Sequence, residues 1–167
     1  MSLFENSDYK WRETYFVYFA SYKLPRLEEA VGRMKTRIPG VQAVESARDT
    51  LGRLQAVSLL FPDTPSAVEI IFSEGDEVEQ QKSELEELLD EKPDRKTRKA
   101  LRNSNARFDI LHFERTGGER RIHDLFEDEA EEIPEDFDPS CMLTLLNQLT
   151  GITHGVAIDP QSGMALT

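Results

Sequence analysis

The sequence has a single cysteine, Cys141, so no disulfide can form within the chain. It also lacks long apolar runs, and no stretch approaches the ~18 residues that a membrane-spanning helix needs. The first ten residues, MSLFENSDYK, contain acids and no apolar core, which does not fit a secretory signal. These absences predict a reduced, cytoplasmic setting and no membrane partner.

The chain has fewer basic residues than acidic ones. Lys and Arg number 20 against 32 Asp and Glu, which gives a formal net charge of −12. This balance argues against nucleic acid as the main partner. No P-loop, dinucleotide-binding glycine pattern or HExxH motif occurs, and the three histidines, His112, His123 and His154, lie far apart in the sequence. The sequence therefore predicts neither a cofactor nor a metal.

A length of 167 residues with 38% hydrophobic residues suits a single domain, 1–167, with a sizeable core. The high charged fraction of 31% indicates that one or two acidic segments are solvated. We expect residues 1–10 to be disordered and 127–136 (EDEAEEIPED) to be a mobile acidic linker. Residues 138–166 read as a C-terminal extension made of a helix and a short β-hairpin.

The most strand-like stretch is 11–20, WRETYFVYFA, because aromatic and β-branched side chains fit a pleated, half-buried surface. Its first half is polar on both faces and its second half, from Tyr15, is apolar on both. A strand with one wet face would alternate cleanly. Residues 15–20 are therefore expected to cross the middle of a sheet, with the polar half near an edge or end.

Glycine and proline residues separate the remaining predicted helices and strands. Apolar residues spaced at i, i+3, i+4 and i+7 predict a helix from Leu27 to Ile38, ended by Pro39-Gly40. Residues 67–72 read as a short strand or as a continuation of the strand before it. Strands are expected at 41–47, 54–61, 107–115 and 155–159, and helices at 76–91, 95–103 and 139–150, the last ended by Gly151.

From residue 11 to 115 the order is strand, helix, strand, strand, helix, strand, with one extra short strand. This is the βαββαβ arrangement of the ferredoxin-like fold, an α+β class with an antiparallel sheet and both helices on one face. The expectation is a topological analogy, and the fold hosts unrelated functions.

Two residues are candidates for chemistry. His112 lies inside an apolar strand and is a possible general base in a pocket at the sheet surface, although such a histidine is more often a half-buried residue satisfied by its neighbours. Cys141 lies in the first turn of the last helix, where the helix N-terminus favours a thiolate. Against reactivity, a small apolar residue packs well there, and no second cysteine exists to resolve an oxidised form.

Charged segments suggest partners. The acids of Glu127–Asp138 do not have the spacing of a calcium-binding loop, so they predict a solvated linker or a surface for a basic protein partner. The acidic helix at 76–91 precedes the basic helix at 95–103. Folded back as a hairpin, the two would place three acids near three cations: Glu84, Glu87 and Glu91 near Arg95, Arg98 and Lys99. The basic run lacks the aromatic residues that stack on RNA bases, so the pattern favours charge complementarity within the chain or with a partner.

Two hypotheses on function follow. The first is a non-catalytic interaction or regulatory module. In it, the sheet face that the two core helices leave open is covered either by the C-terminal helix, 139–150, or by a second copy in a homodimer. The second is a small-molecule-binding protein or cofactor-free enzyme, with a pocket between the sheet and the C-terminal helix and His112 as a polar handle. The sequence favours the first, because it offers no convergent set of catalytic residues.

Overall fold

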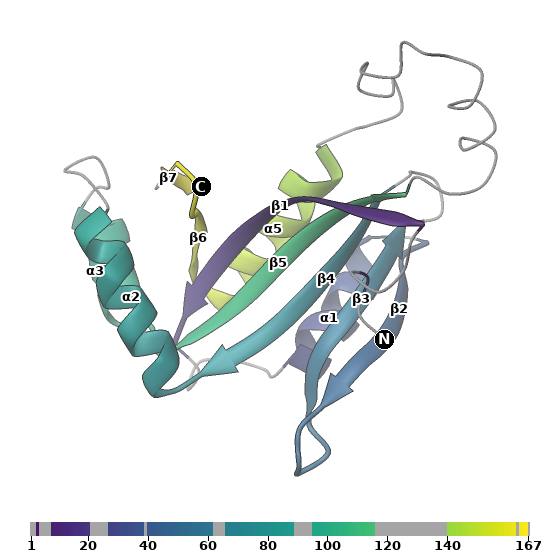
Figure 1. The fold of residues 1–167 in the computed structure, drawn as a ribbon, viewed down its shortest axis with the longest axis horizontal. Helices are drawn as coiled ribbons and strands as arrows, with labels where there is room; N and C mark the ends of the chain where they lie inside the picture. Colours follow the sequence, from purple (N-terminus) through teal and green to yellow (C-terminus); the bar gives the residue numbers. More distant parts are fainter. Residues whose placement is uncertain are drawn as a thin grey trace.

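The computed structural model describes Leu3 and residues 8–20, 27–38, 40–61, 66–88, 95–115, 140–162 and 164–166, with the backbone alone at 88, 140, 141 and 164. It is an α+β fold with a seven-stranded antiparallel sheet (Figure 1). The strands are β1 (Tyr9–Phe19), β2 (Gln42–Arg48), β3 (Leu54–Phe61), β4 (Ser66–Glu74), β5 (Ala106–Arg115), β6 (Val156–Asp159) and β7 (Met164–Leu166). The helices are α1 (Leu27–Arg37), α2 (Asp76–Leu88), α3 (Arg95–Arg102) and α5 (Ser140–Thr153).

The sheet has the order β2-β3-β4-β5-β1-β6-β7. β1 lies inside it, as expected for a strand that is apolar on both faces. It pairs with β5 over its whole length but with β6 only from Phe16 to Tyr18. The polar first half of β1 therefore has a partner strand on one side alone within the described residues. Tyr9 and Lys10 belong to β1 rather than to a disordered terminus.

The strand order does not confirm the ferredoxin-like topology. The segment expected as a short extra strand is β4, which pairs with β3 along one edge and with β5 along the other. It is a nine-residue interior strand, buried from Ser66 to Ile70, and it separates β3 from β1 and β5. The expectation of both helices on one face is also wrong, since α1 and α2 pack in different clusters on opposite faces.

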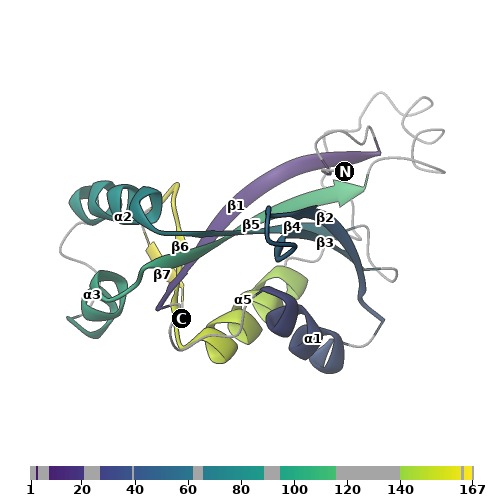
Figure 2. The ribbon, with the colours of Figure 1, turned by 90° about the horizontal axis from the view of Figure 1, so that it is seen from below.

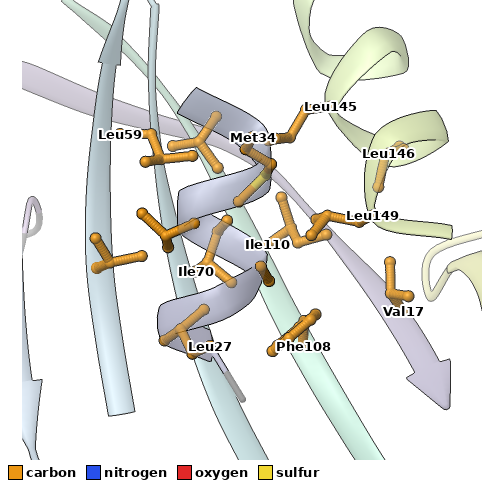
Figure 3. Close-up of a cluster of buried hydrophobic side chains, with 14 of the residues drawn as sticks. Val17, Leu27, Met34, Leu59, Ile70, Phe108, Ile110, Leu145, Leu146 and Leu149 are labelled. Carbon is orange, nitrogen blue, oxygen red and sulfur yellow. The ribbon is translucent and has the colours of Figure 1, made fainter. Parts of the chain in front are cut away.

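The first face of the sheet is the one that carries Val17, Ile70 and Ile110, and it holds the main core (Figure 3). α1 covers it with Leu27 and Met34. α5 lies beside α1 on the same face, as Figure 2 shows, and adds a leucine stripe: Leu145, Leu146 and Leu149. The predicted C-terminal helix therefore thickens the core that α1 begins, and it does not cover the other face.

The second face carries Phe16, Tyr18, Ile71, Asp109 and Leu111, as the register and the alternation of side chains require. α2 and α3 cover one end of it, where Tyr18 packs in a cluster with Val78 and Leu85 of α2, Leu101 of α3, and Val156 and Ile158 of β6. Leu3 is buried at the other end against Phe113 and Ala67. Between these ends, Phe16, Ile71 and Leu111 remain partly exposed.

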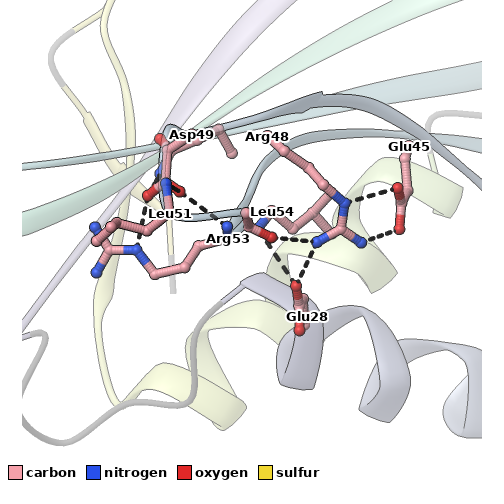
Figure 4. Close-up of polar contacts among 9 residues, drawn as sticks. Glu28, Glu45, Arg48, Asp49, Leu51, Arg53 and Leu54 are labelled. Atoms are coloured by element: carbon pink, nitrogen blue, oxygen red, sulfur yellow. Dashed lines mark hydrogen bonds and ion pairs between the residues drawn. The ribbon is translucent and has the colours of Figure 1, made fainter.

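The β2–β3 hairpin is fastened to α1 by charged groups (Figure 4). Arg48 forms ion pairs with Glu45 and with Glu28 of α1, the latter at 2.9 Å, and donates to the Gly52 carbonyl oxygen at 2.6 Å. In the turn, Asp49 accepts hydrogen bonds from the Leu51 and Arg53 amides at 2.9 and 2.8 Å. Gly52 has φ 79°, a left-handed conformation that glycine adopts without strain.

The C-terminal helix runs past Gly151, where the sequence predicted its end. Ile152 and Thr153 are buried against the rest of the fold, so packing extends the helix by another half turn. It stops at His154, which has φ 54°, and the Thr153 hydroxyl accepts a hydrogen bond from the Gly155 amide at 3.0 Å. β6 and β7 then form the predicted hairpin.

A buried lysine joins α2 to α3. Lys82 is 5% exposed, and its Nζ donates to the carbonyl oxygens of Arg102 and Ser104 at 2.9 and 2.8 Å. It also pairs with Glu79 at 2.8 Å. The ammonium thus satisfies carbonyls at the end of α3, where the backbone has no helical partner. Among the described residues, this lysine links the two helices that the sequence led us to expect as a hairpin.

Replacing Lys82 with methionine should lower the free energy of unfolding by about 2 kcal/mol, because two carbonyl oxygens lose a charged donor while they stay buried. Urea unfolding followed by circular dichroism measures this. Gln80→Met is the control, since Gln80 is exposed on the same helix and receives the same side chain. Equal stability of the two variants would contradict the assigned role of Lys82.

Candidate functional site

A β-bulge in β1 lies beside the main polar cluster. Trp11 pairs with Phe113 and Glu13 pairs with His112, so Arg12 is an extra residue in the strand. Glu13 lies on the first face with Tyr15 and Val17, as plain alternation along β1 requires. The bulge moves Trp11, which alternation alone would place on the first face, onto the second. Bulges are enriched near functional sites because they re-aim side chains in this way.

His112 lies between an acid and a hydroxyl. Its Nδ1 is 3.4 Å from Glu13 Oε1, and its Nε2 is 3.3 Å from Ser66 Oγ. Glu13 belongs to β1, His112 to β5 and Ser66 to β4. When Nδ1–H donates to the Glu13 carboxylate, Nε2 becomes the acceptor for the Ser66 hydroxyl. His112 shares a face with Phe108 and Ile110, as alternation along β5 requires.

Burial controls the charge of this cluster. Removal from water lowers the pKa of His112 below its usual 6.5, against the opposing effect of Glu13. Burial also raises the pKa of Tyr15, and a hydrogen bond to Glu13 adds to the shift. On the same face, Arg12 forms an ion pair with the buried Glu114. At neutral pH the histidine is therefore neutral and Tyr15 keeps its proton.

Because the folded pKa of His112 is depressed, the unfolded chain binds its proton first, and stability falls as the pH drops below 6.5. The loss from this group reaches at most about 1.4 kcal/mol at one pH unit below that value. His112→Gln should remove this part of the pH dependence. Urea unfolding of both proteins at about pH 7.5 and about pH 5.5 measures it. Identical pH dependence in the two proteins would contradict the assigned neutral state.

The cluster has two chemical interpretations. An acid, a histidine and a serine in this order form the hydrogen-bond pattern of a nucleophilic triad. The same pattern also satisfies three polar groups that folding removes from water. Ser66 is 4% exposed and His112 is 1% exposed, so a substrate has no direct path to either in this conformation. The arrangement therefore accounts for the burial of His112 more directly than it indicates catalysis.

The other candidates from the sequence are not brought into this cluster. Cys141 lies in α5, but its side chain is outside the described part of the structure. His123 and the acidic segment Glu127–Asp138 also lie outside the described residues. His154 is exposed just after α5, as expected for a turn residue.

The sequence missed Glu13 and Ser66. Strict alternation places Glu13 on the face of Tyr15 and Val17, where it lies, but no pattern in the sequence indicates that His112 is its cross-strand partner. Ser66 faces His112 only because β4 lies between β3 and β5. A pairing pattern that the sequence did not indicate therefore brings these residues together.

The middle of the second face forms a separate candidate surface. Cross-strand partners place Phe16, Asp109 and Ile71 in one row and Thr14, Leu111 and Glu69 in the next. Glu69 is buried and accepts a hydrogen bond from the Leu3 amide at 3.2 Å. Exposed apolar side chains stand at both margins of this face, Trp11 at 40% and Val44 at 52%. The rows mix apolar and polar side chains, and the exposed apolar ones at the margins suit contact with another protein.

No group of three or more metal-binding side chains gathers among the described residues. None of the described helices is long and apolar enough to cross a membrane. No protein-family model, curated protein sequence or solved structure matches this chain.

Proposed function

We propose that this chain is a non-catalytic interaction module that forms a homodimer through the second face of its sheet. The observation that carries the proposal is the distribution of helices. α1 and α5 both cover the first face, and α2 and α3 cover only one end of the second. In the described residues, Phe16, Ile71 and Leu111 remain partly exposed between that end and Leu3.

The residues at the margins of the surface favour this role. Tryptophan is enriched among the residues that dominate binding energies, and Trp11 is 40% exposed with its Nε1 donating to Thr14 at 3.0 Å. A twofold contact would use the surface twice, so each apolar row would be covered by its equivalent on the partner. Stacked sheets pack about 10 Å apart, which leaves room for one layer of side chains from each copy.

Trp11→Glu should convert the dimer to a monomer. A charge at a desolvated contact costs about 3 kcal/mol or more, which weakens dimerisation roughly 100-fold. Size-exclusion chromatography with light scattering in about 300 mM NaCl, which screens contacts between exposed charges, measures the mass, expected to fall to 19.1 kDa. Leu143→Glu is the matched control, because Leu143 is 53% exposed on α5, away from the second face. A wild-type monomer, or equal loss in both variants, would contradict the proposal.

A second candidate is a cofactor-free hydrolase, and the Glu13–His112–Ser66 geometry favours it. In such a reaction the Ser66 oxygen would attack an ester or amide carbonyl while His112 accepts the hydroxyl proton. His112 would then protonate the leaving group, and water would release the acyl group from Ser66 by the same steps. Glu13 would stabilise the charged imidazolium during both acylation and deacylation of Ser66.

Labelling with a fluorophosphonate probe, followed by peptide mapping, separates the two candidates. An active serine would form an adduct at Ser66 that Ser66→Ala abolishes and Ser58→Ala does not. Ser58 is a fair control, since it is equally buried but lies on the second face. The interaction module predicts no adduct at Ser66.

A further inference from the structure

α3 presents a concentrated positive surface on an acidic protein. Its sequence RKTRKALR carries five cations in eight residues. Arg95, Lys99 and Arg102 fall at i, i+4 and i+7, so they form one stripe along the helix, and all three are exposed. Leu101 is buried on the other side of the helix. The stripe, defined here by Arg95, Lys99 and Arg102, therefore faces away from the fold.

The stripe has no ion-pair partner in the described part of α2. Among residues 76–88 and 95–102, no ion pair joins a carboxylate of α2 to any residue of the stripe. The connection between the helices is Lys82, which donates to backbone carbonyls. Within the described residues the three cations of the stripe form no ion pair with α2, which leaves them able to contact another acidic group.

The chain itself contains the complementary sequence. Residues 127–138, EDEAEEIPEDFD, hold eight carboxylates and no cation. They account for two thirds of the net charge of −12, so the rest of the chain has a formal net charge of −4. A run with this charge density attracts a compact cationic surface more strongly than any other segment of the chain does.

The fold favours a second copy as the source of this run. The run lies between Arg115, the last residue of β5, and Ser140, the first residue of α5, and both are at one end of the molecule (Figure 1). α3 lies at the opposite end, just before β5 begins (Figure 2). β5 has ten residues and so spans about 33 Å. A run tethered at both of its ends would have to cross this length twice to reach α3 of its own chain.

We propose that the basic stripe of α3 in one copy is the docking surface for the acidic run 127–138 of a second copy. The contact joins two different surfaces, so it is heterologous and can extend beyond a dimer. It uses a surface separate from the second sheet face, and it goes beyond the proposed function. Because its groups are exposed, salt screens it strongly, whereas salt leaves an apolar sheet contact intact.

Sedimentation velocity of the full chain carrying Trp11→Glu, which removes the sheet contact, tests the proposal. Raising NaCl from about 20 mM to about 300 mM should weaken association at least about tenfold. Adding Arg95→Glu and Lys99→Glu should abolish association at low salt. The control pair is Arg33→Glu with Lys35→Glu, two exposed cations of α1 that change the net charge equally. This control should still associate.

A second pair of proteins identifies the occupant. Neutralising Glu131, Glu132, Glu135 and Asp136 to their amides should also give a monomer, because this protein keeps the stripe but loses its ligand. Mixing it with the Arg95→Glu/Lys99→Glu protein should restore a one-to-one complex and nothing larger. The proposal would be overturned if either variant still associated, or if the control pair lost association equally. It would also be overturned if the two variants formed no complex on mixing. If the sheet-face dimer does not form but the salt-sensitive association does, the proposed function is contradicted and the docking proposal is supported.

Discussion

Gly155→Ala is expected to lower the free energy of unfolding by about 3 kcal/mol, the cost of forcing an extra group into a packed site. An added Cβ would overlap the Tyr18 carbonyl oxygen and would lie 2.8 Å from Thr153 Oγ1 and 3.0 Å from Phe19 Cβ. The first of these neighbours is the backbone of β1, so a side-chain rotation cannot relieve the overlap.

The position explains the size of the effect. Gly155 connects α5 to β6, and β6 pairs with β1 from Phe16 to Tyr18. Displacing it would disturb the one point where the C-terminal hairpin joins the rest of the sheet. In a domain of this length, about 3 kcal/mol corresponds to a fall in Tm of roughly 9 °C.

Gly151→Ala is the matched control. Gly151 is exposed inside α5, and an added Cβ would meet nothing within 4 Å. Alanine is the better helix former by about 1 kcal/mol, so this variant should be as stable as the wild type or more so. Differential scanning calorimetry of both proteins measures the contrast. Equal Tm values for Gly155→Ala and Gly151→Ala would show that β6 does not approach β1 as described.

The second large effect is expected at Arg107. Its guanidinium is buried on the second face, pairs with Asp109, and donates to Tyr18 Oη at 3.3 Å and to Gln81 of α2. It also lies over the Phe16 ring at 4.3 Å from the centroid. This one side chain therefore connects β1, β5 and α2.

Arg107→Met should cost about 3 kcal/mol, because it leaves Asp109 largely buried without its cation. Burial already raises the pKa of Asp109 despite the opposing charge of Arg107. Without that charge the folded pKa rises further, so protonation relieves the penalty. The variant should therefore regain stability, relative to the wild type, as the pH falls from neutral towards the pKa of the carboxyl.

A double-mutant cycle checks the cause. Asp109→Asn in the Arg107→Met background removes the unpaired charge and should recover a substantial part of the loss. Chemical unfolding of the four proteins at neutral pH gives the coupling energy. Strict additivity of the two single changes would mean that the ion pair does not account for the effect of Arg107.

Local elements were predictable because they depend on local sequence. Residues 54–61 coincide with β3, since the run LQAVSLLF is apolar and bounded by a glycine turn and prolines. α1 follows from the spacing of Leu27, Ala30, Val31 and Met34, all of which are buried. The interior position of β1 followed from its two apolar faces, and β5 and β6 flank it.

Arrangements that depend on pairing partners were not predictable. The strand order required β4 to be a full interior strand, and its sequence equally suited a continuation of β3. Lys82 occupies the buried stripe of α2 because distant carbonyls receive its ammonium, which no helical pattern reveals. The Glu13–His112–Ser66 cluster likewise depends on which strands pair with β5. Cys141 remains an untested candidate.

The mass of the unmodified protein in about 300 mM NaCl tests the central proposal most directly, because salt at that level screens contacts between exposed charges. A homodimer built on the second sheet face should persist under these conditions, with a light-scattering mass of 38.2 kDa, twice the chain mass of 19.1 kDa. A homogeneous 19.1 kDa species at every concentration tested would contradict it.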